Sequence, residues 1–311
     1  MTTTLVTGSH GWVGHHLRRQ LVARGHNVVG VGRRQRTVPA GERYLQLNLR
    51  DAPAVAAAVD AIRPTVVLHL AATVPQRNSS LTDVVADAVE STYNLCRALR
   101  TADVGTPPHL VLAGSAAQYG GVPSAENPIS EDTLPRPLNT YGHAKAAAES
   151  LALAMAADGR LRVTVARPFN HVGPGESSAT LAGALASRIA AVLAGRSDRV
   201  QVADLDAVRD FTDVRDVARA YVELAEISQA EDIYNVCSGS GVTVRTVLET
   251  LLDLANLDHR VVELIEGRSA IRFQVGSAER LAARTGWKAE IPLRESLREL
   301  LTELTDRPAH D

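Results

Sequence analysis

The N-terminus of the chain carries Thr7-Gly8-Ser9-His10-Gly11-Trp12-Val13-Gly14, a run with three glycines spaced three residues apart. A short apolar segment, residues 4–6, precedes this run, and apolar residues at helical spacing follow it. The pattern predicts a strand that turns into a helix through a glycine loop. Glycines permit a tight bend and leave the backbone bare, so that peptide N–H groups at the start of the helix reach phosphate oxygens. We therefore expect this loop to bind the diphosphate of a dinucleotide rather than to be an ordinary glycine-rich turn.

The residues after the next strands indicate which dinucleotide would bind. The apolar segment 28–31 ends at Gly32-Arg33-Arg34, where an acidic residue would bind a free ribose 2′-hydroxyl and arginine would bind a 2′-phosphate. Because no acidic residue stands there, we favour NADP(H) over NAD(H), although a solvated basic loop would have the same composition. Other positions expected beside the cofactor follow the third and fourth strands: Asn48, Leu49, Leu70, Ala71 and Ala72.

The order of the predicted elements indicates the fold class. Strands and helices alternate up to about residue 170, which predicts an α/β fold with a Rossmann-type, doubly wound parallel sheet. The alternation then weakens, and we expect a helix near 179–195, a short strand near 200–203 and then a turn-rich stretch up to Phe211. We accordingly divide the chain into a cofactor-binding domain, residues 1–166, and a smaller α/β lobe, residues 167–311, with later segments returning to the sheet. The lobe should lie at the carboxyl edge of the sheet, where ligands bind in open α/β folds.

Composition narrows the possible classes of protein. The 311 residues are 45% hydrophobic and 22% charged with a net charge of −2, which gives no electrostatic case for binding nucleic acid or an anionic membrane. No apolar run has the length of a membrane span, and the N-terminus has no signal-peptide pattern, so we expect a cytoplasmic protein. Neither Cys96 and Cys237 nor the histidines show metal-ligand spacing, and no metal site is predicted.

Three polar residues fall where the chemistry would take place. Ser115 ends a strand on the ligand edge, and Tyr141 and Lys145 lie one helical turn apart at the start of a helix. A nearby ammonium stabilises a phenolate, so we expect Lys145 to lower the pKa of Tyr141 and to make it a proton donor and acceptor near neutral pH. Ser115 would share the same substrate oxygen and polarise a carbonyl. A Tyr-x-x-x-Lys pair alone is common. The strand-end serine and the glycine turn in the same chain support its assignment as a catalytic pair.

Taken together, the glycine turn, Ser115 and the Tyr141–Lys145 pair resemble the short-chain dehydrogenase/reductase superfamily, and the length of the chain resembles its extended branch of nucleotide-sugar enzymes. The segments 166–175 and 202–216 are similar to the reductases of GDP-4-keto-6-deoxy-mannose. The resemblance implies that residues 167–311 predominantly bind a nucleotide-sugar. It also implies that Pro168 and Phe169 border the nicotinamide and that Tyr141 and Lys145 contact the cofactor.

The same resemblance implies roles for residues of the lobe. Asn170 would meet the sugar or its phosphate, and Arg209 would pair with the nucleotide diphosphate, unless Arg209 instead forms an ion pair with Asp210 or Asp213. Weaker candidates for substrate contacts are Arg188, Val202 and Arg268.

Two departures from the family pattern limit the inference. Asp87 stands where the family pattern has Asn, which leaves its role open. Ser115-Ala116-Ala117 lacks the carboxylate that follows the catalytic Ser or Thr of the dehydratases, so a dehydratase ranks low.

The sequence thus predicts an NADPH-dependent reductase of the 4-keto group of a nucleoside-diphosphate-4-keto-6-deoxyhexose, with GDP favoured and dTDP open. Tyr141 would act as the acid, Ser115 would polarise the carbonyl, and Lys145 would hold the cofactor ribose. The alternatives are a nucleotide-sugar epimerase that retains NAD and a non-catalytic NADP-binding sensor. The resemblance also implies a homodimer formed through the helices predicted at 81–100 and 141–157, whose small residues would allow close approach unless they pack on the sheet.

Overall fold

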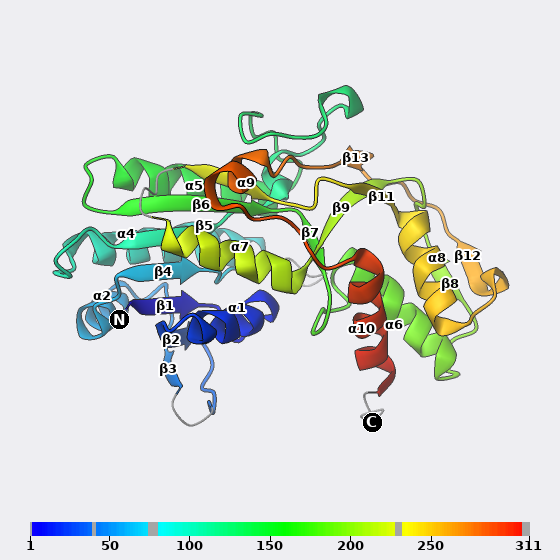
Figure 1. The fold of residues 1–311 in the computed structure, drawn as a ribbon, viewed down its shortest axis with the longest axis horizontal. Coiled ribbons are helices and arrows are strands. Elements are labelled where there is room, and N and C mark those ends of the chain that lie inside the picture. The colour runs from blue at the N-terminus through cyan, green and yellow to red at the C-terminus, as the bar shows by residue number, and fades with distance from the viewer. Residues whose placement is uncertain (1, 39–41, 74–79, 228–231, 307–311) are drawn as a thin grey trace.

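The computed structural model describes residues 2–38, 42–73, 80–227 and 232–306. Its centre is a seven-stranded parallel sheet (Figure 1). The first strand of the sequence lies inside this sheet, with later strands on both sides of it. In spatial order the strands are β10 (Ile233–Val236), β6 (Arg162–Pro168), β5 (His109–Ala113), β4 (Val66–His69), β1 (Thr3–Thr7), β2 (Asn27–Gly32) and β3 (Arg43–Gln46). The prediction of a doubly wound Rossmann-type sheet is therefore confirmed.

Helices cover both faces of the sheet because each buries an apolar stripe against it. One apolar core lies between the sheet and α2 (Ala52–Ile62), α4 (Ser91–Thr101) and α5 (Thr140–Ala156). The opposite core includes residues of α1 (Trp12–Ala23), α7 (Val214–Glu226) and α9 (Glu279–Thr285). The long helix predicted over 81–100 is present, but it consists of α3 (Leu81–Val85), a π-helical turn η1 (Ala86–Glu90) and α4.

The remaining elements form a smaller lobe beyond the carboxyl edge of the sheet. Its helices α6 (Leu181–Leu193), α8 (Val244–Ala255) and α10 (Leu293–Asp306) enclose an apolar core of their own and lie side by side in Figure 1. Short strands complete the lobe: β7 (Asn170–Val172), β8 (Val200–Val202), β9 (Val208–Asp213), β11 (Gly241–Thr243), β12 (Val262–Leu264) and β13 (Phe273–Gln274). Short 3-10 helices are η2 (Ala116–Gln118), η3 (Ser124–Glu126) and η4 (His259–Val261).

The stretch expected to be turn-rich up to Phe211 is so only as far as Ala207, and the prediction is wrong beyond it. It contains β9, which pairs with β7, β11 and β13 and forms the centre of the second sheet. The strand escaped prediction because Val208-Arg209-Asp210-Phe211-Thr212-Asp213 does not alternate between apolar and polar side chains. One of its charged residues, Arg209, belongs to the site described next.

Candidate active site

The glycine turn has the backbone that a diphosphate site requires. Gly8 has a φ of +67°, which favours glycine, and a Cβ at this position would lie 3.0 Å from the Ala71 backbone nitrogen. A Cβ on Gly14 would lie 2.3 Å from the Gly8 carbonyl oxygen, so the first turn of α1 can pack against the loop only without a side chain. Gly11 precedes α1 and caps it with no side-chain hydrogen bond. The turn and the uncapped helix start therefore fit a dinucleotide diphosphate.

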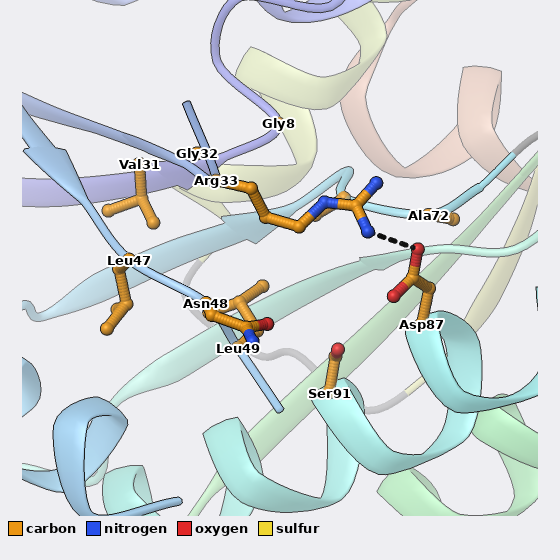
Figure 2. Close-up of a pocket in the computed structure, with 11 residues that line it drawn as sticks. Gly8, Val31, Gly32, Arg33, Leu47, Asn48, Leu49, Ala72, Asp87 and Ser91 are labelled. Atoms are coloured by element: carbon orange, nitrogen blue, oxygen red, sulfur yellow. Dashed lines mark ion pairs between the residues drawn. The ribbon is translucent and has the colours of Figure 1, made fainter. Parts of the chain in front are cut away.

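A pocket beside this turn has six of the predicted cofactor residues in its lining (Figure 2). It lies at the carboxyl ends of β1, β2 and β4. Its lining residues are Gly8, Val31, Gly32, Arg33, Leu47, Asn48, Leu49, Ala71, Ala72, Asp87 and Ser91. A second pocket adjoins it at Arg33 and is basic, with His10, Gly11, Arg34 and Arg36 among its lining residues. The two pockets share Gly8 and Gly32 as well, so the glycine turn, the adenine-side residues and the arginines form one continuous region.

Four of the residues predicted beside the cofactor direct their side chains elsewhere. Ser9 is fully buried, with its hydroxyl 3.2 Å from His10 Nδ1 and 3.5 Å from the Val31 carbonyl oxygen. Trp12 donates from Nε1 to the Pro174 carbonyl oxygen at 2.6 Å. Val13 and Leu70 pack against the apolar core on the α1 side of the sheet. None of the four belongs to the lining of this pocket, a distinction that a motif in a sequence does not carry, whereas Trp12 lines the cleft described below.

The predicted catalytic residues come together at the end of β5. Ser115 accepts a hydrogen bond from the Ala117 backbone N–H at the start of η2, and its side chain is hydrogen-bonded to that of Tyr141. Lys145 donates from Nζ to the Ala113 carbonyl oxygen at 2.7 Å, and Nζ lies 5.9 Å from the centroid of the Tyr141 ring. Two segments far apart in sequence therefore meet where the sheet ends.

Gly142 allows this approach. A Cβ at Gly142 would lie 2.5 Å from the Ala117 carbonyl oxygen, so α5 can begin against η2 only with glycine at this position. Asn139 caps the helix by accepting from the Gly142 backbone N–H at 2.9 Å. The glycine within the Tyr-x-x-x-Lys segment thus sets the distance between Tyr141 and Ser115.

Burial determines the proton affinities of the pair. Desolvation raises the pKa of Tyr141, whereas its hydrogen bond with Ser115 acts in the opposite direction. The expectation that Lys145 lowers the pKa of Tyr141 is therefore wrong, because the Lys145 ammonium is itself directed to the Ala113 carbonyl. Burial lowers the pKa of Lys145 to about 8. Lys145 is thus poised to gain or lose a proton close to neutral pH.

A buried polar network that we did not predict supports Ser115. Gln118 accepts from the Ser115 backbone N–H at 2.8 Å and donates to Glu149 at 2.8 Å. Glu149 forms an ion pair with Arg167, which donates to the Tyr119 hydroxyl at 2.9 Å. Glu149 lies one helical turn beyond Lys145, as Lys145 lies one turn beyond Tyr141. This spacing was the sequence feature that could have placed Glu149 on the same face of the helix as the catalytic pair. The network fixes η2 against α5 and β6.

A cleft of about 530 Å³ extends from Tyr141 and Ser115 into the lobe, a volume typical of a small-molecule site. Pro168, Phe169 and Asn170, which we expect beside the nicotinamide and the sugar, line it. Trp12 and His171 line the same cleft with stacked rings 4.9 Å apart. No group of three or more potential metal ligands occurs among the described residues.

Arg209 lies in the same cleft and not in the alternative ion pairs. Its guanidinium donates to the Ser269 hydroxyl at 2.6 Å and to the Ile271 carbonyl oxygen at 2.7 Å. Asp210 accepts instead from Ser238 and Gly239, and Asp213 caps α7. Arg209 is a half-buried cation whose hydrogen-bond partners are neutral, and desolvation lowers its pKa. An anionic ligand would therefore be stabilised there.

The weaker substrate candidates lie apart from the cleft lining. Arg188 donates to the Gln201 carbonyl oxygen, and Val202 is buried in the core of the lobe. Arg268 is exposed, and its neighbour Arg272 is 2.8 Å from Asp204. By contrast, Glu176 lines the cleft although the sequence did not single it out. It is only 3% exposed, and burial raises its pKa to about 7.

Residues 4–237 match the NAD dependent epimerase/dehydratase family, and the chain belongs to that family. Among curated proteins it is 35% identical to GDP-6-deoxy-D-mannose reductase of Pseudomonas aeruginosa over 97% of each chain. It is also 27% identical to dTDP-6-deoxy-L-talose 4-dehydrogenase (NAD(P)(+)) of Kitasatospora kifunensis over 97% of this chain and 96% of the relative. The expectation of an NAD(P)-dependent enzyme of the epimerase/dehydratase type is thereby confirmed.

Solved structures agree with this assignment. RMD from Pseudomonas aeruginosa, complexed with NADPH, superposes with a TM-score of 0.85 and 32% identity over 99% of this chain and 100% of its own. MoeE5 in complex with UDP-glucuronic acid and NAD has a TM-score of 0.85 and 32% identity over 96% of this chain and 98% of its own. Relatives that bind NADPH and relatives that bind NAD therefore share this fold at similar identity.

Proposed function

We propose that the chain is an NADPH-dependent reductase that converts the 4-keto group of a nucleoside-diphosphate-4-keto-6-deoxyhexose into a hydroxyl group. The observation that carries the proposal is the cleft, which has Ser115 and Tyr141 among its lining residues together with the half-buried cation Arg209. The 35% identity over 97% of each chain to a GDP-6-deoxy-D-mannose reductase supports the same substrate class. A GDP-sugar is the favoured substrate, and a dTDP-sugar is the alternative.

The residues have distinct roles in this reaction. The nicotinamide, when bound, supplies the hydride that C4 of the sugar accepts. The Tyr141 hydroxyl donates its proton to the ketone oxygen, and its raised pKa keeps that proton in place until negative charge develops on the oxygen. Ser115 donates a second hydrogen bond to the same oxygen and stabilises that charge. Lys145, one turn along α5, would bind the cofactor ribose and return a proton to Tyr141.

The choice of NADPH rests on Arg33 and Arg34. Both line the basic pocket beside the glycine turn, in which no carboxylate occurs among the described residues. The guanidinium groups are suited to a 2′-phosphate, whereas a free ribose 2′-hydroxyl is usually bound by an acid at this point. The NADPH complex of RMD, at 32% identity, supports this choice.

The proposal is tested by incubating the protein with NADPH and a panel of GDP-, dTDP- and UDP-4-keto-6-deoxy sugars. We expect NADPH to be consumed with one of these sugars and NMR of the product to show a hydroxyl at C4. Tyr141→Phe should lower kcat by about 100-fold or more while NADPH binding stays intact. Tyr93→Phe, a change of the same type at an exposed tyrosine of α4, is the matched control. Unaltered turnover of Tyr141→Phe would remove Tyr141 as the acid.

A nucleotide-sugar epimerase is the second candidate, favoured by the NAD complexes of structural relatives. One such relative is the Thermus thermophilus UDP-glucose 4-epimerase complex with NAD, at 29% identity and a TM-score of 0.86. An epimerase retains its cofactor through turnover, whereas a net reductase must exchange it. Stoichiometric NAD in the purified protein, with no consumption of NADPH, would decide for the epimerase.

We further propose a homodimer that buries the outer face of the 81–101 helix. Leu81, Val85 and Tyr93 leave 62%, 43% and 42% of their surfaces exposed on this face. Of the small residues in α5, Ala144 and Ala148 pack against Val84 within the subunit, whereas Ala147 is exposed. A monomeric mass in solution would exclude the dimer.

A further inference from the structure

One side chain crosses the pocket that we assign to the dinucleotide. Figure 2 shows Arg33 extending from the end of β2 to Asp87 on the far side, and the two groups form an ion pair at 3.2 Å. Both residues belong to the pocket lining, together with Gly8 and Asn48. The guanidinium therefore occupies space between the diphosphate turn and the adenine-side residues. A bound dinucleotide needs the same space.

Asp87 is held by further partners, whereas the Arg33 side chain is mostly exposed. Arg50 contacts the Asp87 carboxylate through two nitrogens, at 2.8 and 2.7 Å, and Thr73 donates to it. The Asp87 side chain is 9% exposed and lies on the π-helical turn η1, while the Arg33 side chain is 60% exposed. Since Arg50 and Thr73 still satisfy the carboxylate after Arg33 departs, the pair can open without stranding a buried charge.

We propose that the Arg33–Asp87 ion pair is a closed state of the dinucleotide pocket that every ligand must open. A ligand with a 2′-phosphate provides Arg33 with a new anion, which offsets the loss of Asp87. A ligand without that phosphate opens the same ion pair and leaves Arg33 in solvent. Arg33 therefore acts in opposite directions on the two kinds of ligand, as expected for a competing contact that raises specificity. Asp87 is in this scheme a specificity-determining residue of this chain.

The size of the effect follows from the exposure of the pair. Pairs in which one partner is largely exposed contribute little, and closing the pocket should weaken a ligand such as NADH by about two- to fivefold. Asp87→Asn keeps an oxygen for Arg50 and Thr73 but removes the charge that holds Arg33. We therefore expect Asp87→Asn to tighten NADH binding by that factor.

The experiment is a double-mutant cycle on the full chain, read out by calorimetric binding of NADH and NADPH without substrate, at physiological ionic strength to screen long-range repulsion. Both Asp87→Asn and Arg33→Ala should lower the Kd for NADH, and the double variant should bind NADH no more tightly than either single variant. Asp83→Asn is the matched control, since Asp83 pairs with Arg50 at 2.9 Å from the same helix. It should leave NADH affinity unchanged.

Two results would overturn the proposal. If Asp87→Asn tightens NADH equally in the Arg33→Ala background, Asp87 acts as a plain negative charge near the diphosphate. If Arg33→Ala leaves NADH unchanged or weakens it, Arg33 does not close the pocket. Only the part of the proposal in which Arg33 binds the 2′-phosphate of NADPH rests on the proposed function. Arg33→Ala should weaken NADPH, and an unchanged NADPH affinity beside an intact NADH cycle would reject the cofactor assignment but leave the closed pocket standing.

Discussion

Glu176→Gln should become more stable relative to the wild type as the pH rises from acid to alkaline. Glu176 lies between β7 and α6, where its carboxyl group accepts from the Gly173 and Gly183 backbone N–H groups, each at 3.3 Å, and from Thr180. Burial raises the pKa of the carboxyl group from 4.5 to about 7. Between these two pH values the folded chain holds a proton that the unfolded chain releases, so the free energy of unfolding falls as the pH rises.

The magnitude follows from that pKa. Each pKa unit corresponds to about 1.36 kcal/mol, so ionisation of Glu176 removes about 3 kcal/mol of stability once the pH exceeds about 7. Glutamine resembles the protonated carboxyl group and keeps an acceptor oxygen. The advantage of Glu176→Gln over the wild type should therefore grow by about 2 to 3 kcal/mol between about pH 5 and about pH 8.

Urea denaturation at both pH values measures this difference, with Glu126→Gln, a change at an exposed glutamate of η3, as the control. A constant difference between variant and wild type across that range would refute the assigned ionisation. Because Glu176 lines the cleft together with Arg209, the same ionisation should raise the KM for an anionic nucleotide-sugar above about pH 7 in the wild type but not in Glu176→Gln.

Three further predictions concern the cofactor turn, the substrate cation and the catalytic lysine. Gly14→Ala places a Cβ 2.3 Å from the Gly8 carbonyl oxygen, so we expect a lower Tm by calorimetry and loss of NADPH binding. Arg209→Ala should raise the KM for the nucleotide-sugar by roughly 10- to 100-fold and leave the NADPH Kd unchanged, and an unchanged KM would exclude Arg209 as the diphosphate ligand. The Lys145 ammonium, with a pKa of about 8, is lost as the pH rises through that value, so kcat/KM should fall above about pH 8 in a steady-state profile.

Much of the fold and part of the site could be predicted because local patterns specify them. The glycine spacing predicted a turn that the backbone at Gly8 and Gly14 requires. The strand end at Ser115 and the helical spacing of Tyr141 and Lys145 predicted a meeting point at one edge of the sheet, because parallel strands end at the same edge. Each of these inferences uses either residues close in sequence or a rule of sheet topology.

What could not be predicted depends on distant partners and on burial. Lys145 donates its hydrogen bond to the Ala113 carbonyl oxygen rather than to Tyr141. The spacing of residues in the sequence does not indicate which partner a side chain takes. Arg33 and Asp87 are 54 residues apart and meet through the π-helical turn. Glu176 shifts its pKa because the lobe folds over it, and glutamate in a loop carries no mark of that burial in the sequence.

The path of the chain between the sheet and the lobe restricts how the cleft can open. The chain leaves the sheet after β6, returns with α7 and β10, leaves again with β11 and α8, and returns with α9 before it ends in α10. Several backbone crossings therefore tie the two parts together, which restricts a hinge motion about any single linker. We expect substrate entry to use small sliding movements or side-chain rotations. A fragment that ended at residue 166 would also leave β6 without its neighbour β10, as an unpaired edge prone to aggregation.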